Sequence, residues 1–161
     1  MLAVSLAGML NVGVVGAQEA FAGAWKIEKS EAAPWAKTAD MLDAKEIKHL
    51  VGASVDFKAA GITGPAPLAC GGAHYEIKQY EADEVFQGAL AEYGDPATTP
   101  DKMADTIGFG KRPIASLVTD CASEIEFHAL DADHLIFALN HSLYRMTRTP
   151  PAGKPAAKST P

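Results

Sequence analysis

The stretch Phe21-Ala-Gly-Ala-Trp-Lys26 determines the fold that we expect for this chain. It opens a segment, Trp25 to Ser30, in which apolar and polar residues alternate, and this alternation is typical of a half-buried β-strand. The run Ser142-Leu-Tyr-Arg-Met-Thr-Arg148, near the other end of the chain, is also rich in β-forming residues. A Gly-x-Trp motif in the first strand and a basic residue in the last strand together indicate a small closed β-barrel.

The last third of the chain predicts an antiparallel meander. Four β-rich segments follow one another at residues 114–121, 124–130, 134–140 and 142–148. In the second of these, Ile125, Phe127 and Ala129 form an apolar face, and the intervening residues form a mixed one. Earlier short strands are expected at residues 53–57, around Ile62 and at residues 75–77.

Helical signals interrupt these strands. Apolar residues spaced as on one side of a helix predict a helix between residues 81 and 94, carrying Val85, Phe86, Leu90 and Tyr93. The clearest helix is expected from Thr99, a good N-cap, to Gly108, a good terminator. Residues 42–51 show a looser helical spacing. The predicted fold class is therefore mainly β: an antiparallel β-barrel or strongly curved sheet with one or two short helices.

Three segments divide the chain. Residues 1–17 are uncharged and almost wholly apolar, which is typical of a secretory leader, although a short membrane anchor is the alternative interpretation. Residues 18–148 are expected to form a single β-barrel-like domain. The proline-rich and lysine-containing residues 149–161 are too polar to bury and are expected to be disordered. A cleaved leader predicts a periplasmic or secreted protein with no stable membrane insertion.

The charge limits the partners that the chain can bind. The formal net charge is −6 at pH 7, and phosphate-rich partners require a basic surface. We therefore expect neither nucleic acid nor anionic membrane to be a partner.

Two cysteines, Cys70 and Cys121, belong to the predicted domain. In an oxidising compartment an even pair predicts one disulfide. Two free thiols in the core or a metal-binding pair are the alternatives, and the chain has no Cys-x-x-Cys spacing that would favour metal.

The residues Gly23-Ala-Trp25, with Phe21 before them and Lys26 after them, resemble the N-terminal signature of the calycins, the superfamily of lipocalins and fatty-acid-binding proteins. The resemblance implies an antiparallel barrel in which the tryptophan closes one end. It also implies that a basic residue of the last strand, here Arg145 or Arg148, lies over the indole ring. Such a cation–π contact contributes about 0.5–2 kcal/mol.

The sequence favours a non-catalytic binding protein without a cofactor. The first hypothesis is a small apolar ligand held in the barrel interior, in a pocket lined by Val55, Phe57, Tyr75, Phe127, Phe137 and Leu139. The second hypothesis is a protein-binding module, such as an inhibitor of an envelope or foreign enzyme. It would act through the loops Ala33-Pro-Trp35 and Gly64 to Leu68.

A third hypothesis is a metal-dependent enzyme that uses His128, His134 and Glu126. Zinc requires three or four converging ligands, and these side chains flank one predicted hairpin turn. We interpret them instead as the solvated polar face of a sheet. The chain has no Gly-x-Ser-x-Gly motif for a serine nucleophile, and Ile107-Gly-Phe-Gly110 follows a helix where a phosphate loop would precede one.

Overall fold

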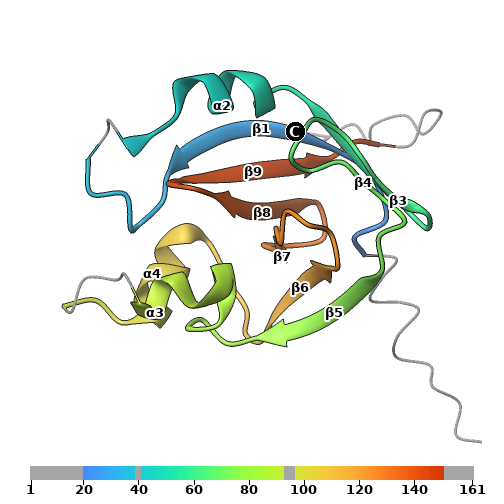
Figure 1. Cartoon of the computed structure of the whole chain (residues 1–161). Coiled ribbons are helices and arrows are strands. Elements are labelled where there is room, and N and C mark those ends of the chain that lie inside the picture. Colours follow the sequence, from blue (N-terminus) through green and yellow to red (C-terminus); the bar gives the residue numbers. More distant parts are fainter. Residues whose placement is uncertain (1–19, 39–40, 93–96, 151–161) are drawn as a thin grey trace, which may run out of the picture.

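The computed structural model describes residues 20–38, 41–92 and 97–150 (Figure 1). Within these ranges the chain forms a nine-stranded antiparallel sheet in the order β4-β3-β2-β1-β9-β8-β7-β6-β5. The strands are β1 (Gly23–Ala32), β2 (Ser54–Lys58), β3 (Gly61–Thr63), β4 (Cys70–Gly71), β5 (Tyr75–Tyr80), β6 (Ile114–Thr119), β7 (Phe127–Ala129), β8 (His134–Leu139) and β9 (Ser142–Arg148). The helical elements are α2 (Ala44–Leu50), the 3-10 turn η2 (Val85–Gly88), α3 (Ala89–Glu92) and α4 (Pro100–Ile107). The predicted mainly β class with a curved antiparallel sheet is confirmed.

The predicted leader, residues 1–17, and residues 151–161 of the predicted tail lie outside the described residues. Just beyond the predicted end of the domain, the Thr149 amide donates to the Ala24 carbonyl at 2.8 Å. Within the described ranges, none of the helices has both the length and the apolar character that a bilayer crossing would require.

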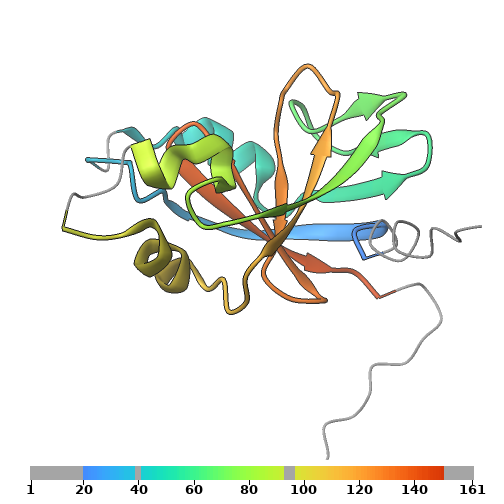
Figure 2. The same cartoon turned by 90° about the horizontal axis from the view of Figure 1, so that it is seen from below.

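The sheet curls until its two ends approach each other. Phe57 of β2 packs edge-on against Phe127 of β7 with ring centroids 4.8 Å apart, although three strands separate β2 from β7 in the sheet. The two outermost strands, β4 and β5, face each other across a seam that the described backbone ladder does not bridge (Figure 2). The result is a half-barrel.

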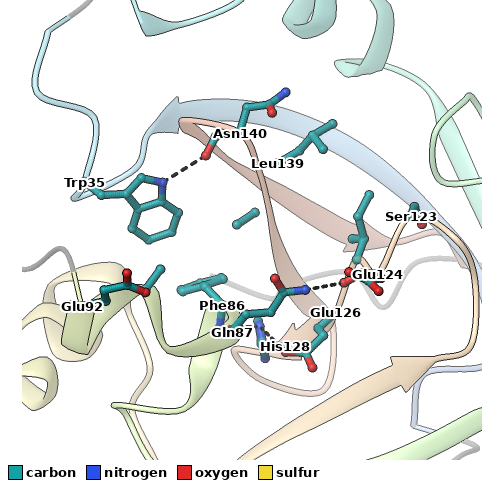
Figure 3. Close-up of a pocket in the computed structure, with 13 residues that line it drawn as sticks. Trp35, Phe86, Gln87, Glu92, Ser123, Glu124, Glu126, His128, Leu139 and Asn140 are labelled. Carbon is teal, nitrogen blue, oxygen red and sulfur yellow. Dashed lines mark hydrogen bonds and ion pairs between the residues drawn. The ribbon is translucent and has the colours of Figure 1, made fainter.

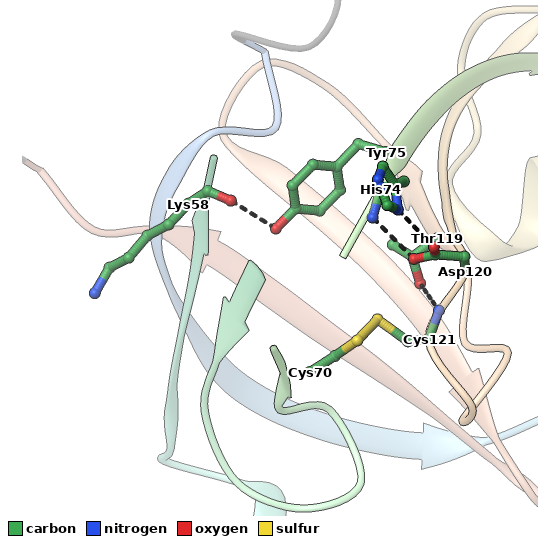
Figure 4. Close-up of a disulfide and its surroundings, with 7 residues drawn as sticks. All are labelled: Lys58, Cys70, His74, Tyr75, Thr119, Asp120 and Cys121. Carbon is green, nitrogen blue, oxygen red and sulfur yellow. Dashed lines mark hydrogen bonds and ion pairs between the residues drawn. A yellow bond between two sulfur atoms is a disulfide. The ribbon is translucent and has the colours of Figure 1, made fainter. Parts of the chain in front are cut away.

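Side chains close the seam where the ladder stops (Figure 4). Cys70 of β4 is joined to Cys121, just after β6, by the predicted disulfide, with a Cα–Cα distance of 5.9 Å. Tyr75 of β5 donates its hydroxyl hydrogen to the Lys58 carbonyl of β2 at 2.8 Å. Gly61 lets β3 pass close to β4, since a Cβ built on it would lie 2.3 Å from the Cys70 carbonyl oxygen.

The first and last strands pair as the opening motif predicts. Trp25 lies opposite Arg148 in the β1–β9 ladder, so both side chains project to one face. The Arg148 guanidinium carbon lies 4.1 Å from the centre of the fully buried Trp25 ring. That guanidinium also donates to the carbonyls of Ala20 and Ala22, and Gly23, at φ +102°, allows the turn that presents them.

Arg145 does not take part in this closure, and the prediction that it could is wrong. It lies three residues from Arg148, and side chains an odd number apart on a strand project to opposite faces. Arg145 donates instead to Glu31 Oε1 at 2.6 Å and to the Ile107 carbonyl at 2.6 Å. It therefore ties the end of α4 to β1.

Each face of the sheet carries its own hydrophobic core. The inner core, on the face that the curl encloses, is built from buried side chains of nearly every strand and of α2: Phe21, Trp25, Ile27, Leu50, Val55, Phe57, Ile62, Leu68, Ala73, Leu117, Cys121, Ile125, Phe127, Leu135, Phe137, Tyr144 and Met146. The outer core lies under α3 and α4, on the other side of β8 from α2 (Figure 1): Ala33, Ala82, Val85, Phe86, Leu90, Met103, Ala104, Ile107, Phe109, Ile114, Ile136 and Leu143.

The helix α4 forms as predicted, with the Thr99 hydroxyl accepting from the Lys102 amide and Gly108 at φ +108°. The helix predicted between residues 81 and 94 is wrong in its first half. Phe86 and Gln87 adopt left-handed backbone conformations, which break the regular helical turn, so that α3 begins only at Ala89. The last residues of that prediction, including Tyr93, lie outside the described residues. The strand predicted at 124–130 is shortened to β7, because Glu124 is also left-handed.

Candidate functional site

A cleft of about 340 Å³ opens where the inner and outer cores meet (Figure 3). One wall is the η2–α3 segment, and a second is the connection from β6 to β7 together with β7 itself. The end of β8, its hairpin turn and the loop holding Trp35 complete it. The lining residues are Trp35, Phe86, Gln87, Ala89, Glu92, Ser123, Glu124, Ile125, Glu126, His128, Ala138, Leu139 and Asn140. We call this site the cleft.

Backbone strain is concentrated at the cleft. Among the described residues, four non-glycine residues have φ between +52° and +58°: Phe86, Gln87, Glu124 and Asn140. All four line the cleft. The left-handed conformation costs an ordinary residue roughly 1–2 kcal/mol, and such conformations persist where surrounding contacts hold them. The conformational cost of these four residues is therefore concentrated at the cleft.

His128 holds the strained turn on its cleft side. The Phe86 amide donates to Nε2 of His128 at 3.2 Å, so Nε2 is an acceptor and the proton of the neutral ring is on Nδ1. Nδ1 donates to the Ser116 hydroxyl at 2.7 Å, and that hydroxyl faces the Ile114 carbonyl at 3.3 Å. Complete burial lowers the pKa of His128 to about 3, so the imidazole stays neutral.

Hydrogen bonds that involve side chains also hold Gln87 and Asn140 in place. The Gln87 side-chain amide donates to the Glu124 carbonyl at 2.7 Å, which joins two of the strained residues across the cleft. The Asn140 side-chain amide donates to Glu46 of α2 at 2.6 Å, and its carbonyl accepts the indole hydrogen of Trp35 at 3.0 Å. The walls of the cleft are therefore fixed to one another by side-chain hydrogen bonds.

Glu126 places a carboxylate at the base of the cleft. Its Oε1 accepts from the Tyr80 hydroxyl at 2.9 Å. Its Oε2 is buried and has no hydrogen-bond partner among the described residues. His128 Nε2 lies 4.0 Å from Oε2, but this is not an ion pair because the imidazole is neutral. Burial raises the pKa of Glu126, and burial together with the Glu126 hydrogen bond raises the pKa of Tyr80 to about 12.

Aromatic rings form the apolar side of the cleft. Trp35 is tilted against Phe86 with ring centroids 5.7 Å apart, and Phe86 packs edge-on against His128 at 4.7 Å. Leu139 and Ile125 continue this surface toward the inner core. The cleft thus combines aromatic and aliphatic walls with a few fixed polar groups, the composition typical of small-molecule sites.

The residues predicted to line an interior ligand pocket are not gathered in one pocket. Val55, Phe57, Phe127 and Phe137 are buried in the inner core, where Phe127 packs against Phe137 at 5.4 Å. Tyr75 lies at the seam. Of the predicted set, Leu139 alone lines the cleft.

The two loops predicted to contact a partner protein are placed differently from each other. Trp35 is half-buried and lines the cleft, while its neighbour Ala33 is buried in the outer core. Leu68, in the second loop, is 1% exposed and belongs to the inner core. The second loop therefore turns its one large apolar side chain inward.

The interpretation of His128 as part of a solvated polar face is wrong, because α3 and its neighbours cover that face and leave the ring fully buried. His134 is exposed, and its Nδ1 contacts Asp131 at 2.8 Å. Both ring nitrogens of His128 already have protein partners. The described residues contain no group of three or more His, Cys, Asp or Glu side chains positioned to hold a metal ion.

Sequence reasoning missed most of the cleft. Asn140 was recognisable, because asparagine tolerates the left-handed region and Asn140-His141 separates two predicted strands. Phe86, Gln87 and Glu124 are ordinary residues in helical or strand patterns, and no local signal distinguishes them. Comparison with known proteins supplies no further guide: the sequence matches no protein-family model and no curated protein, and the fold matches no solved structure.

Proposed function

We propose that this protein is a non-catalytic binding protein that holds a small ligand with an apolar body in the cleft. The observation that carries the proposal is the convergence of four left-handed, non-glycine residues on one site of the described structure. Local strain is a recurrent feature of ligand-binding sites, where it presents side chains in a fixed geometry. A volume of about 340 Å³ is at the small end of the range for ligand pockets.

The cleft is preferred to the barrel interior because the interior side chains contact one another. The chain of contacts from Phe57 to Phe127, Phe137 and Tyr144 runs at centroid separations of 4.8, 5.4 and 5.0 Å. A ligand there would have to displace a packed aromatic cluster. In the cleft, the aromatic faces of Trp35 and Phe86 line existing volume.

A binding role is preferred to catalysis because of the part that His128 plays. Its two nitrogens hold Ser116 and the strained Phe86 amide, and burial keeps its pKa near 3. A general base would need a free nitrogen within reach of a substrate and a pKa near the working pH. His128 instead supports the wall of a binding site.

The proposed compartment is the periplasm or the extracellular space. The predicted leader and the Cys70–Cys121 disulfide support this, since disulfides persist in oxidising compartments. We also propose that the chain is calycin-like. The contact between Trp25 and Arg148 supports that relation.

The test uses the two tryptophans as reporters, because the chain contains only Trp25 and Trp35. A ¹⁵N-labelled protein is titrated with 2-phenylethanol, a neutral aromatic probe, and the two indole N–H resonances are followed. We expect a saturable shift of the Trp35 resonance and little change of Trp25, which lies in the inner core. Ala138→Leu, which adds a larger side chain to the cleft wall, should abolish the shift.

Ala132→Leu, at an exposed turn, is the matched control and should bind as the wild type does. A saturable response at Trp25 without one at Trp35 would place the ligand in the barrel interior and contradict the proposal. Unchanged binding by Ala138→Leu would contradict it too.

A further inference from the structure

We infer that the ligand of the cleft is an organic cation: a protonated amine or amidine group on a small apolar or aromatic body. This inference rests on the proposed function and names the ligand class of the same site. Three observations carry it: the charges that line the cleft, the unsatisfied oxygen of Glu126, and the aromatic faces beside it.

The charges around the cleft have one sign. Its lining includes Glu92, Glu124 and Glu126, and no lysine or arginine is among the lining residues. The one ring that could carry a positive charge, His128, is kept neutral by burial. Lys78 lies outside the lining and lowers the pKa of Glu126 only as a lesser effect than burial, and its ammonium group is 3.6 Å from Glu76 on the same strand. An anionic ligand would therefore meet uncompensated repulsion.

The Glu126 carboxylate is only half satisfied by the protein. Tyr80 occupies Oε1, while Oε2 is buried without a hydrogen-bond partner in the described structure. A buried polar atom without a partner is costly and calls for an explanation. Because Oε2 has almost no accessible surface, the Glu126 carboxylate has to turn toward the cleft to accept a donor carried by a ligand. A charged donor then forms a stronger hydrogen bond than a neutral donor does.

Aromatic rings line the same cleft as the carboxylates. Trp35 and Phe86 line the same cleft as Glu126 (Figure 3). Tryptophan and phenylalanine faces attract cations, and a pocket that pairs such faces with carboxylates selects a cation over a neutral molecule of the same shape. The apolar residues Ala138 and Leu139 provide the surface for the uncharged part of the ligand.

The test compares three probes of one shape and different charge. Phenethylammonium, neutral 2-phenylethanol and anionic phenylacetate are titrated separately while the Trp35 indole resonance is followed. We expect phenethylammonium to bind at least tenfold more tightly than 2-phenylethanol, and phenylacetate to bind most weakly. Glu126→Gln should reduce the preference for phenethylammonium over 2-phenylethanol to less than threefold. Glu28→Gln, an exposed position on β1, is the control and should keep the full preference.

The outcomes separate this inference from the proposed function. If 2-phenylethanol binds at Trp35 as tightly as phenethylammonium, the charge inference is overturned while the binding site stands. Tighter binding of phenylacetate would also overturn it. If none of the three probes shifts Trp35, the proposed function fails as well. A second readout guards against a folding defect: binding of phenethylammonium should lower the pKa of Glu126, followed by ¹³C carboxyl titration, because a nearby cation favours the ionised form.

Discussion

The inner core and the outer core lie on opposite faces of the same strands and are filled differently. On β8, Leu135 and Phe137 point into the inner core, while Ile136 points into the outer core. The inner core is apolar, and its aromatic rings contact one another. The outer core adjoins a buried histidine, a buried serine and a carboxylate with an unpartnered oxygen. The difference leads us to propose that the inner core mainly supplies stability, while the polar groups beside the outer core contribute to the proposed binding site.

Exchanging tryptophan for alanine in each region tests this comparison most strongly. Trp25→Ala should lower the free energy of unfolding by about 3–5 kcal/mol, because it empties the inner core and removes the ring beneath Arg148. Trp35→Ala, at the half-buried cleft, should cost about 1–2 kcal/mol, within the range of ordinary substitutions. Urea unfolding of the two variants measures the difference. Equal losses would show that the two regions contribute alike.

Removing the disulfide tests whether the inner core depends on closure of the seam. Cys70 and Cys121 are 51 residues apart, and in the chain-entropy model a loop of that length contributes up to about 4 kcal/mol. The double variant Cys70→Ala/Cys121→Ala should lose up to that amount in thermal or urea unfolding. The binding of 2-phenylethanol at Trp35 should survive at temperatures where the variant is folded. Loss of binding in a folded variant would show that the cleft depends on the seam.

The pH dependence of stability should come partly from the outer core. The pKa of His128 is about 3 in the folded protein and 6.5 in the unfolded chain, so between these values the unfolded state binds the extra proton. Stability from this group is complete above pH 6.5 and is lost as the pH falls toward 3. The loss should reach about 1–2 kcal/mol by pH 5.

His128→Gln should flatten this part of the stability profile, measured by urea unfolding from pH 7 to pH 5. His49→Gln, at an exposed position of α2, should retain the wild-type slope. An unchanged slope in His128→Gln would mean that the imidazole is not kept neutral by burial.

The inner core was predictable because its signals are local or lie at the two ends of the chain. The alternation of apolar and polar residues around Trp25 and Phe127 indicates strands with one buried face. The even number of cysteines predicts the Cys70–Cys121 disulfide. The last strand offers two arginines as the partner of Trp25. Arg148 is an even number of residues from Tyr144 and Met146, so its side chain projects to the same face as these inner-core residues, and that of Arg145 does not. Even so, alternation cannot tell a filled interior from a hollow one, since inward residues are apolar in both cases. Val55, Phe57 and Phe137, which the sequence predicts to line a ligand pocket, are buried side chains of the inner core.

The outer core was not predictable because tertiary contacts override local preference there. Phe86 and Gln87 continue a helical pattern in the sequence. In the structure, however, the Phe86 backbone amide donates to His128 and the Gln87 side chain donates to the Glu124 carbonyl, and both partners lie about 40 residues away in the sequence. The mixed face of β7 likewise gives no sign that helices will cover it. The cleft thus lies where local sequence patterns and the folded structure disagree, as is expected of functional sites.

The seam between β4 and β5 has a consequence for self-association. An exposed sheet edge is a template on which other chains can add strands, and it invites aggregation. Here one edge is the two-residue strand β4, and the disulfide holds it near the six-residue strand β5. Covalent closure therefore keeps the β3–β4 hairpin in front of the longer edge, although no ladder in the described structure joins the two, and we expect reduction to leave that edge more open to neighbouring molecules.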